Sequence, residues 1–183
     1  FRGRSTLASR ARRIGEPGMI AAGSSAALVL LPLVLPVAIW VAWSDMRFMK
    51  IPNKAVIALL AIFALAGPFV LPFDQYGWRW LHFAAVLAIG FILTIAGLIG
   101  AGDAKFAAAM APFIALGDLR LFFAVLAASL LGAFAAHRLM RALPAFRRAT
   151  PQWASWTHAK FPMGLALSGS LLIYLALVLA FGR

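Results

Sequence analysis

Residues 19–43 read MIAAGSSAALVLLPLVLPVAIWVAW, an apolar stretch that contains no charged side chain. A transmembrane α-helix needs about 20 apolar residues to cross the hydrocarbon core of a bilayer. The stretch is therefore predicted to be a membrane-spanning helix. Pro32 and Pro36 should bend this helix, because each proline removes a backbone hydrogen-bond donor.

Similar apolar segments recur along the chain and predict an all-α fold, a polytopic membrane bundle of about six transmembrane helices. The expected spans run approximately from Met19 to Trp43, Ala55 to Leu71, Trp80 to Ile99, Phe106 to Leu116, Leu119 to Leu139, and Phe161 to Phe181. The fourth span is short, because at about 1.5 Å per residue it covers only half to two-thirds of a core about 30 Å thick. It is either extended by its flanks or a partial span packed inside the bundle.

The composition also indicates a membrane protein. Hydrophobic residues make up 64% of the chain and charged residues 12%, with a mean hydropathy of +0.94. A soluble domain is about half apolar and about a quarter charged. A chain of 183 residues is expected to form one domain. We assign residues 19–183 to a single membrane-embedded domain, and residues 1–18, which carry five arginines, to a basic N-terminal tail.

The net charge of +12 comes from 17 basic and five acidic residues. In a soluble protein this charge would suggest nucleic-acid binding. Here the basic residues gather between the apolar runs, where positive charge sets membrane orientation, so the lipid bilayer and not nucleic acid is the expected partner. The chain has no cysteine, which excludes disulfides, thiol catalysis and Cys-ligated zinc. The three histidines lie far apart and form no metal-ligand spacing, so neither a metal nor a cofactor is predicted.

The basic residues of the internal loops favour a cytoplasmic location for the loop at residues 44–54, because most of them then lie on that side. The basic tail contradicts this orientation, since it would lie on the opposite side. The segment 141–160 is predicted to be a long basic loop that contains Trp153 and Trp156. Two interpretations of this loop stay open: a surface segment held against anionic headgroups, or a flap that guides a substrate.

Few acidic residues are available for chemistry: Glu16, Asp45, Asp74, Asp103 and Asp118. On the predicted topology Asp45 follows the first span and Asp103 follows the third, so both lie at the cytoplasmic face. Asp74 and Asp118 fall on the other side. Asp45 and Asp103 are therefore the only pair that is expected to meet at one membrane surface within the bundle.

Each of these two aspartates has a distinctive neighbourhood. Residues 100–105 read GAGDAK, and the glycines before Asp103 allow close backbone approach. The ordinary alternative is a helix-stop turn in which Asp103 caps the next helix. Residues 45–54 read DMRFMKIPNK, in which Pro52 favours an extended residue before it and Asn53 is predicted to be the N-cap of the second span. The ordinary alternative is a polar hairpin that follows the positive-inside rule.

Together with residues 160–164, which read KFPMG, these segments resemble the motifs of the type IV prepilin peptidases, which are membrane aspartic peptidases of the GxGD type. The resemblance covers nearly everything from about residue 25 onward. It implies that Asp45 and Asp103 are catalytic. The supporting motif residues that it implies are Pro52, Asn53, Gly100, Gly102, Lys105, Pro162 and Gly164.

Within that family the chain looks like the small, peptidase-only members that process Flp-type (tight-adherence) pilins. Larger relatives carry a cytoplasmic insert with paired Cys-x-x-Cys motifs and also methylate the new N-terminus. This chain has no cysteine and no room for such an insert, so no methyltransferase activity is expected.

The resemblance also implies a substrate and a mechanism. The substrate is a prepilin, a Flp-type pilin or pseudopilin precursor, with a basic leader that ends in glycine and is followed by a hydrophobic helix. Cleavage after that glycine would occur at the cytoplasmic face of the bacterial inner membrane. Two nearby carboxylates share a proton, so one activates a water molecule while the other polarises the scissile carbonyl. A short fourth span, with Gly97, Gly100 and Gly102 before it, would leave room for the substrate helix.

Two other functions compete with this interpretation. A non-enzymatic membrane assembly factor of a pilus or secretion system would not need either aspartate. A small transporter would need polar groups near the middle of several spans, where this sequence offers only Thr94, Ser129, Ser168 and Ser170. The oligomeric state is not predicted.

Overall fold

The computed structural model describes residues 20–183, and the regular secondary structure of this range consists of helices, apart from one isolated bridge between Ile20 and Gly182. The α-helices are α2 (Ser24–Phe48), α3 (Asn53–Val70), α4 (Phe73–Ile95), α5 (Ala101–Met110), α6 (Leu119–Ala142), α7 (Pro144–Ala149) and α8 (Met163–Phe181). Three short 3₁₀ helices join them: η1 (Ala111–Phe113), η2 (Leu116–Asp118) and η3 (Ala154–Trp156). The predicted all-α fold is confirmed. The expected basic tail at residues 1–18 lies outside the described range.

Five of the helical segments are long and apolar enough to cross a bilayer: Ser24–Phe48, Asn53–Val70, Phe73–Ile95, Leu116–Ala142 and Met163–Phe181. Their outer faces carry large apolar side chains. Leu65, Phe69 and Leu131 are 72%, 89% and 72% exposed. A soluble monomer rarely exposes so much contiguous apolar surface. The bundle is therefore built to be surrounded by lipid, and the chain is a membrane protein.

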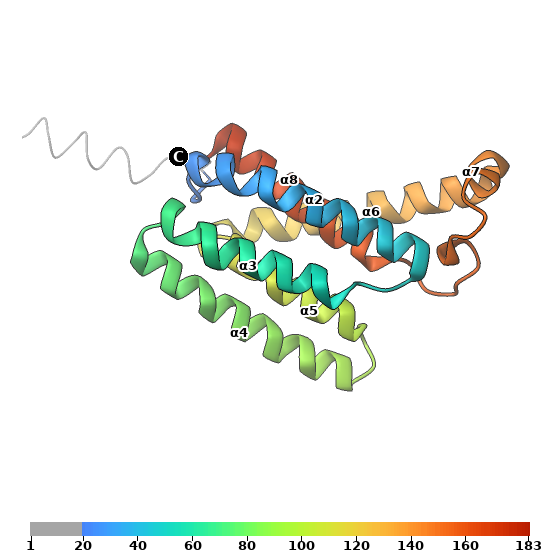
Figure 1. Ribbon diagram of the computed structural model, residues 1–183, viewed down its shortest axis with the longest axis horizontal. Helices are drawn as coiled ribbons and strands as arrows, with labels where there is room; N and C mark the ends of the chain where they lie inside the picture. The colour runs from blue at the N-terminus through green and yellow to red at the C-terminus, as the bar shows by residue number, and fades with distance from the viewer. Residues whose placement is uncertain (1–19) are drawn as a thin grey trace, which may run out of the picture.

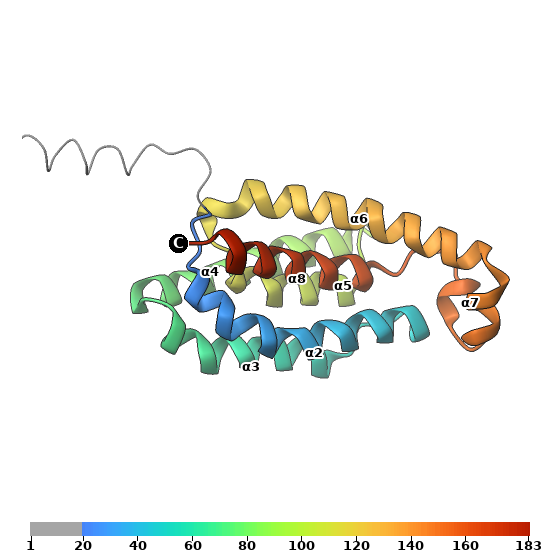
Figure 2. The ribbon, with the colours of Figure 1, turned by 90° about the horizontal axis from the view of Figure 1, so that it is seen from above.

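The long helices run roughly along one axis, with α2 and α8 packed against each other in opposite directions (Figures 1 and 2). Helix α6 packs against the other side of α8, while α3 contacts α2 and α5. Helix α4 covers α5 and lies at the outer side of the bundle in Figure 1. Helix α7 lies beyond one end of the bundle, next to the points where α2 ends and α8 begins.

Helix α5 is the short central element. It has 10 residues, which corresponds to about 15 Å of helix, and Pro112 then replaces the α-helix by the 3₁₀ turn η1 because proline lacks a backbone N–H. Every residue from Ala108 to Ala115 is buried. Arg79 of α4 donates a 2.9 Å hydrogen bond to the Pro112 carbonyl, which satisfies a group left free beyond the end of α5. The fourth segment is thus a partial span packed inside the bundle, the second of the two predicted alternatives.

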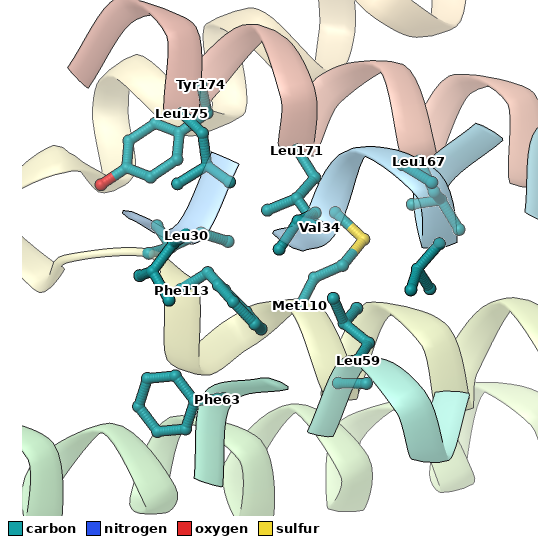
Figure 3. Packing of buried hydrophobic residues seen from close by; sticks show 14 of the residues in the cluster. Leu30, Val34, Leu59, Phe63, Met110, Phe113, Leu167, Leu171, Tyr174 and Leu175 are labelled. Atoms are coloured by element: carbon teal, nitrogen blue, oxygen red, sulfur yellow. The ribbon is translucent and has the colours of Figure 1, made fainter. Parts of the chain in front are cut away.

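The core is formed where side chains of α5 and η1 enter the space between the other helices. Figure 3 shows Met110 and Phe113 between Leu171 of α8 on one side and Leu59 and Phe63 of α3 on the other. All five side chains are at most 3% exposed. Because lipid is as apolar as these side chains, close packing more than the hydrophobic effect holds membrane helices together.

Several predicted ends of spans differ from the ends of the helices: the first helix begins at Ser24 and not at Met19, and the third ends at Ile95 and not at Ile99. Helix α2 continues beyond Trp43 to Phe48, helix α4 begins at Phe73 and not at Trp80, and residues 144–149 form α7 within a segment predicted to be a loop. Hydropathy reports only the apolar part of a helix, so polar turns at the ends of spans are missed. The consequence matters for the site, because Asp45 lies inside the last turns of α2 and not in a loop after it.

A buried polar cluster joins three segments at the end of the bundle that lies away from Asp45. The Asp118 carboxylate, 4% exposed, accepts hydrogen bonds from the backbone N–H groups of Ala21 (2.6 Å) and Ala22 (3.0 Å) and from the Tyr174 hydroxyl (2.9 Å). The Tyr174 oxygen in turn accepts a 3.1 Å hydrogen bond from the N–H of Ala115. The cluster joins the segment before α2, the segment before α6 and the last turns of α8.

We predict that Tyr174→Phe destabilises the fold by about 1–3 kcal/mol, because it leaves the buried Ala115 N–H without its acceptor and removes one of the two donors to Oδ2 of Asp118. The measurement is the thermal unfolding midpoint in detergent. Tyr76→Phe is the matched control, since the Tyr76 hydroxyl makes only one 3.3 Å bond, to the Ala64 carbonyl. Equal midpoints for the two variants would show that the cluster contributes nothing.

Candidate active site

Four helices bring their ends together around a cavity of about 550 Å³. Helix α2 ends there, and α3, α5 and α8 begin there. Asp45 and Asp103 both line the cavity. The other polar or conformationally special residues in its lining are Met49, Lys50, Asn53, Gly100, Gly102, Lys105, His158 and Lys160. The two acids that the sequence analysis paired therefore lie at one end of the bundle and face one space.

Asp45 is held by the first turn of α8. Its side chain is 5% exposed, and its Oδ2 accepts a 2.6 Å hydrogen bond from the backbone N–H of Gly164. Gly164 follows Pro162, the N-cap of α8, and Met163, the first residue of that helix. The first N–H groups of a helix have no partner within the helix and carry partial positive charge, so they bind a carboxylate well. This contact fixes the position of the Asp45 side chain.

Lack of space requires glycine at position 164, because the N–H donor itself would be present in any residue except proline. A Cβ added at Gly164 would lie 2.9 Å from Oδ2 and 3.0 Å from Cβ of Asp45. Real side chains do not approach this closely, so any larger residue at position 164 must displace the carboxylate or the helix. The Lys-x-Pro-x-Gly motif thus has a direct structural role beside one of the two acids.

Asp103 lies in the first turn of α5, and the N-cap of this helix is Gly100. The alternative in which Asp103 caps the helix is therefore wrong. A Cβ at Gly100 would lie 2.7 Å from Oδ2 of Asp103, so the carboxylate folds back over the start of its own helix. Burial raises the pKa of Asp103 above its ordinary value, while a backbone hydrogen bond from Gly100 and the positive charge of Lys160 act in the opposite direction. The carboxyl group thus keeps its proton to a higher pH than an exposed aspartate.

The short connection between α2 and α3 forms one wall of the cavity. Met49 adopts the left-handed conformation (φ 53°) that often ends a helix, and the Ser44 hydroxyl donates a 2.9 Å hydrogen bond to the Lys50 carbonyl. Pro52 is the N-cap of α3, and Asn53 is its first residue, without a side-chain capping bond. The prediction that Asn53 caps the second span was therefore wrong: the extended Pro52 occupies the N-cap position, and Asn53 already lies in the helix.

The remaining predicted residues take different positions. Lys105 lines the cavity with an exposed side chain, and Gly102 lies against Ile51, since a Cβ there would be 3.5 Å from the Cβ of Ile51. Pro162 is fully buried behind the site.

His158, which the sequence patterns did not single out, also lines the cavity. It accepts a 3.1 Å hydrogen bond at Nδ1 from the backbone N–H of Lys160, the first residue of the third motif segment. The only feature of the sequence that could have indicated a role for His158 is its position two residues before the motif segment 160–164. Within residues 20–183 no three His, Asp or Glu side chains form a group that would hold a metal ion.

A comparison with known protein families decides the class to which this site belongs. The model of the type IV leader peptidase family matches residues 32–137, a range that contains both Asp45 and Asp103. The chain belongs to this family. It is therefore a peptidase of the leader peptidase type. No curated protein and no solved structure matches the chain.

We predict that Gly164→Ala lowers peptidase activity at least about tenfold, because it displaces the Asp45 carboxylate that lines the cavity, and a misplacement of an ångström in an active site costs up to about 100-fold in rate. Gly169→Ala, on the same helix, is the matched control, since a Cβ at Gly169 meets nothing within 4 Å. The measurement is kcat/KM in membranes at equal expression. Wild-type activity in Gly164→Ala would mean that the position of Asp45 does not matter for catalysis.

Proposed function

We propose that this leader peptidase is an aspartic endopeptidase with Asp45 and Asp103 as its catalytic pair. One observation carries the proposal: two partly or fully buried carboxylates from distant parts of the chain line one cavity at one end of the bundle. Asp74 is exposed at the start of α4, and Asp118 is fully engaged in the polar cluster at the other end. Neither of them reaches the cavity lining.

The pair would work as a shared-proton dyad. Two nearby carboxylates do not ionise together, so the pair holds one proton near neutral pH. The ionised member removes a proton from a water molecule, whose oxygen attacks the scissile carbonyl carbon, while the protonated member donates its proton to the carbonyl oxygen. Collapse of the resulting diol breaks the C–N bond, and the departing amine takes up a proton from the pair. The Gly164 N–H keeps Asp45 in place throughout.

The substrate that we propose is the precursor of a Flp-type pilin or pseudopilin, from which the enzyme removes the basic leader by cleaving after a glycine. This follows from the resemblance of the three motifs to the small prepilin peptidases. The connection between α2 and α3 consists of residues 49–52 only, and the chain contains no cysteine. These features support a peptidase without the methyltransferase activity of the larger relatives.

The proposed location is the bacterial inner membrane, with the cavity facing the cytoplasm. Support comes from the charges at the cavity end of the bundle, where basic side chains lie in the connections or in the first turns of the helices that follow them. They are Lys50, Lys54, Lys105, Arg147, Arg148 and Lys160. Positive residues in short loops are concentrated on the cytoplasmic side of membrane proteins.

The test of the catalytic pair is cleavage of a Flp-type prepilin in membranes by wild type, Asp45→Asn and Asp103→Asn. Asparagine keeps the size of the side chain but supplies neither the shared proton nor the base, so each change should abolish processing. Asp74→Asn is the control and should cleave like wild type, because Asp74 lies in the first turn of α4, away from the cavity. Wild-type cleavage by either site variant would remove that residue from the mechanism and revive the assembly-factor interpretation.

We also predict a pH effect of Lys160. Its positive charge lowers the pKa of Asp103, so Lys160→Gln should raise that pKa and let the pair keep its proton to higher pH. Activity is lost at high pH when this proton leaves. The alkaline limb of the kcat/KM profile should therefore move to higher pH in Lys160→Gln but stay in place in Lys54→Gln. A shift to lower pH would contradict the shared-proton mechanism.

A further inference from the structure

A second cavity opens between α4, α5 and α6, away from the carboxylate pair. It has a volume of about 340 Å³. Its walls include Val86 of α4, Phe123 and Leu126 of α6, and Leu167 of α8, and its floor includes Ala107 and Ala111. We call this cavity the lateral groove. It exists because α5 is short and carries small side chains, so α4 and α6 stand on either side of it without a bulky helix between them.

On two helices the lateral groove lies one turn beyond the catalytic cavity. On α5, Asp103 lines the catalytic cavity, and Ala107, one turn further, lines the groove. On α8, Met163 lines the catalytic cavity, and Leu167, again one turn further, lines the groove. Residues four apart lie on the same face of a helix, with a rise of about 6 Å between them. Two helices thus present one continuous face, first to the carboxylate pair and then to the groove.

We propose that the lateral groove holds the apolar helix of the substrate that follows the cleaved bond. The inference rests on the proposed function, because a leader peptidase must hold the bond at the end of such a helix. A helix lying in the groove would begin beside Asp103 and run along α5. Ala107 and Ala111 would permit the close backbone approach on which helix association in membranes depends. The apolar walls suit a helix that carries no charge.

A competing surface is the apolar cavity of about 490 Å³ between α6 and α8. Its lining includes Ala128, Gly132 and Gly169, small residues that also permit close approach. It contains no residue of α5, the helix that carries Asp103. A substrate helix lying there would not contact the face of α5 that continues from Asp103, so this surface serves as the comparison in the experiment.

Disulfide crosslinking tests the location directly, because the chain has no cysteine of its own. Single cysteines are placed at Phe123 in the lateral groove and at Ala128 in the competing cavity, both on α6 and both exposed. The partner is a prepilin with one cysteine in the first half of its hydrophobic helix, and oxidation is performed in membranes. We expect a crosslink with Phe123→Cys and little or none with Ala128→Cys. A crosslink only at Ala128, equal crosslinking at both, or none at Phe123 would overturn the proposal.

A second measurement separates this inference from the proposed function. Ala107→Phe fills the groove, and Ala128→Phe is its control. We expect Ala107→Phe to cleave the full precursor at least tenfold more slowly than wild type, but to retain cleavage of a short peptide that contains the leader junction without the helix. Equal cleavage of the precursor by both variants would exclude the groove while leaving the peptidase intact. If wild type cleaves neither substrate, the proposed function fails instead. Should Ala107→Phe lose both activities, the crosslinking result decides the location.

Discussion

The hydrogen bond from the Gly164 N–H to the Asp45 carboxylate is the interaction on which the site depends. It joins the end of α2 to the beginning of α8, and these two helices pack against each other along their length. A buried carboxylate without such a partner would cost several kcal/mol. The bond therefore stabilises the fold and also positions a carboxylate of the candidate site. It explains why the motif that contains Gly164 lies beside Asp45 in α2. The same interaction fixes the register between the two helices.

Much of the fold could be predicted from the sequence, because apolar length is a strong signal in membrane proteins. The number and order of the spans, the short fourth segment and the pairing of Asp45 with Asp103 at one end all follow from the hydropathy pattern. The exact ends of the helices could not be predicted from the hydropathy pattern. Asp45 lies within α2 because a polar turn extends the helix past the apolar region, and Pro52 occupies the N-cap position expected for Asn53. The Asp118–Tyr174 cluster was not predicted, because it joins segments far apart in the chain that no local pattern relates.

The shortness of α5 connects the architecture to the site. A full-length helix in its place would fill the interior of the bundle from one membrane surface to the other. Instead Pro112 ends the α-helix after ten residues, and Arg79 and the 3₁₀ turn satisfy the backbone that remains. Asp103, one of the two proposed catalytic acids, therefore lies at the start of a helix with small side chains, where another helix has space to approach it.

The buried cluster at the opposite end has a consequence for motion. Helices α2 and α8 are joined at one end by Asp45 and Gly164, and at the other by Asp118, which binds Tyr174 and the backbone before α2. A pair of helices fastened at both ends resists both sliding and splaying. Any opening of the bundle in the membrane must then come from the outer helices. Helix α4 is the candidate, because it packs mainly against α5 and η1 and not against the fixed pair. The pair of α2 and α8 would thus stay rigid and hold the carboxylates in place, while α4 moves to let a substrate helix enter.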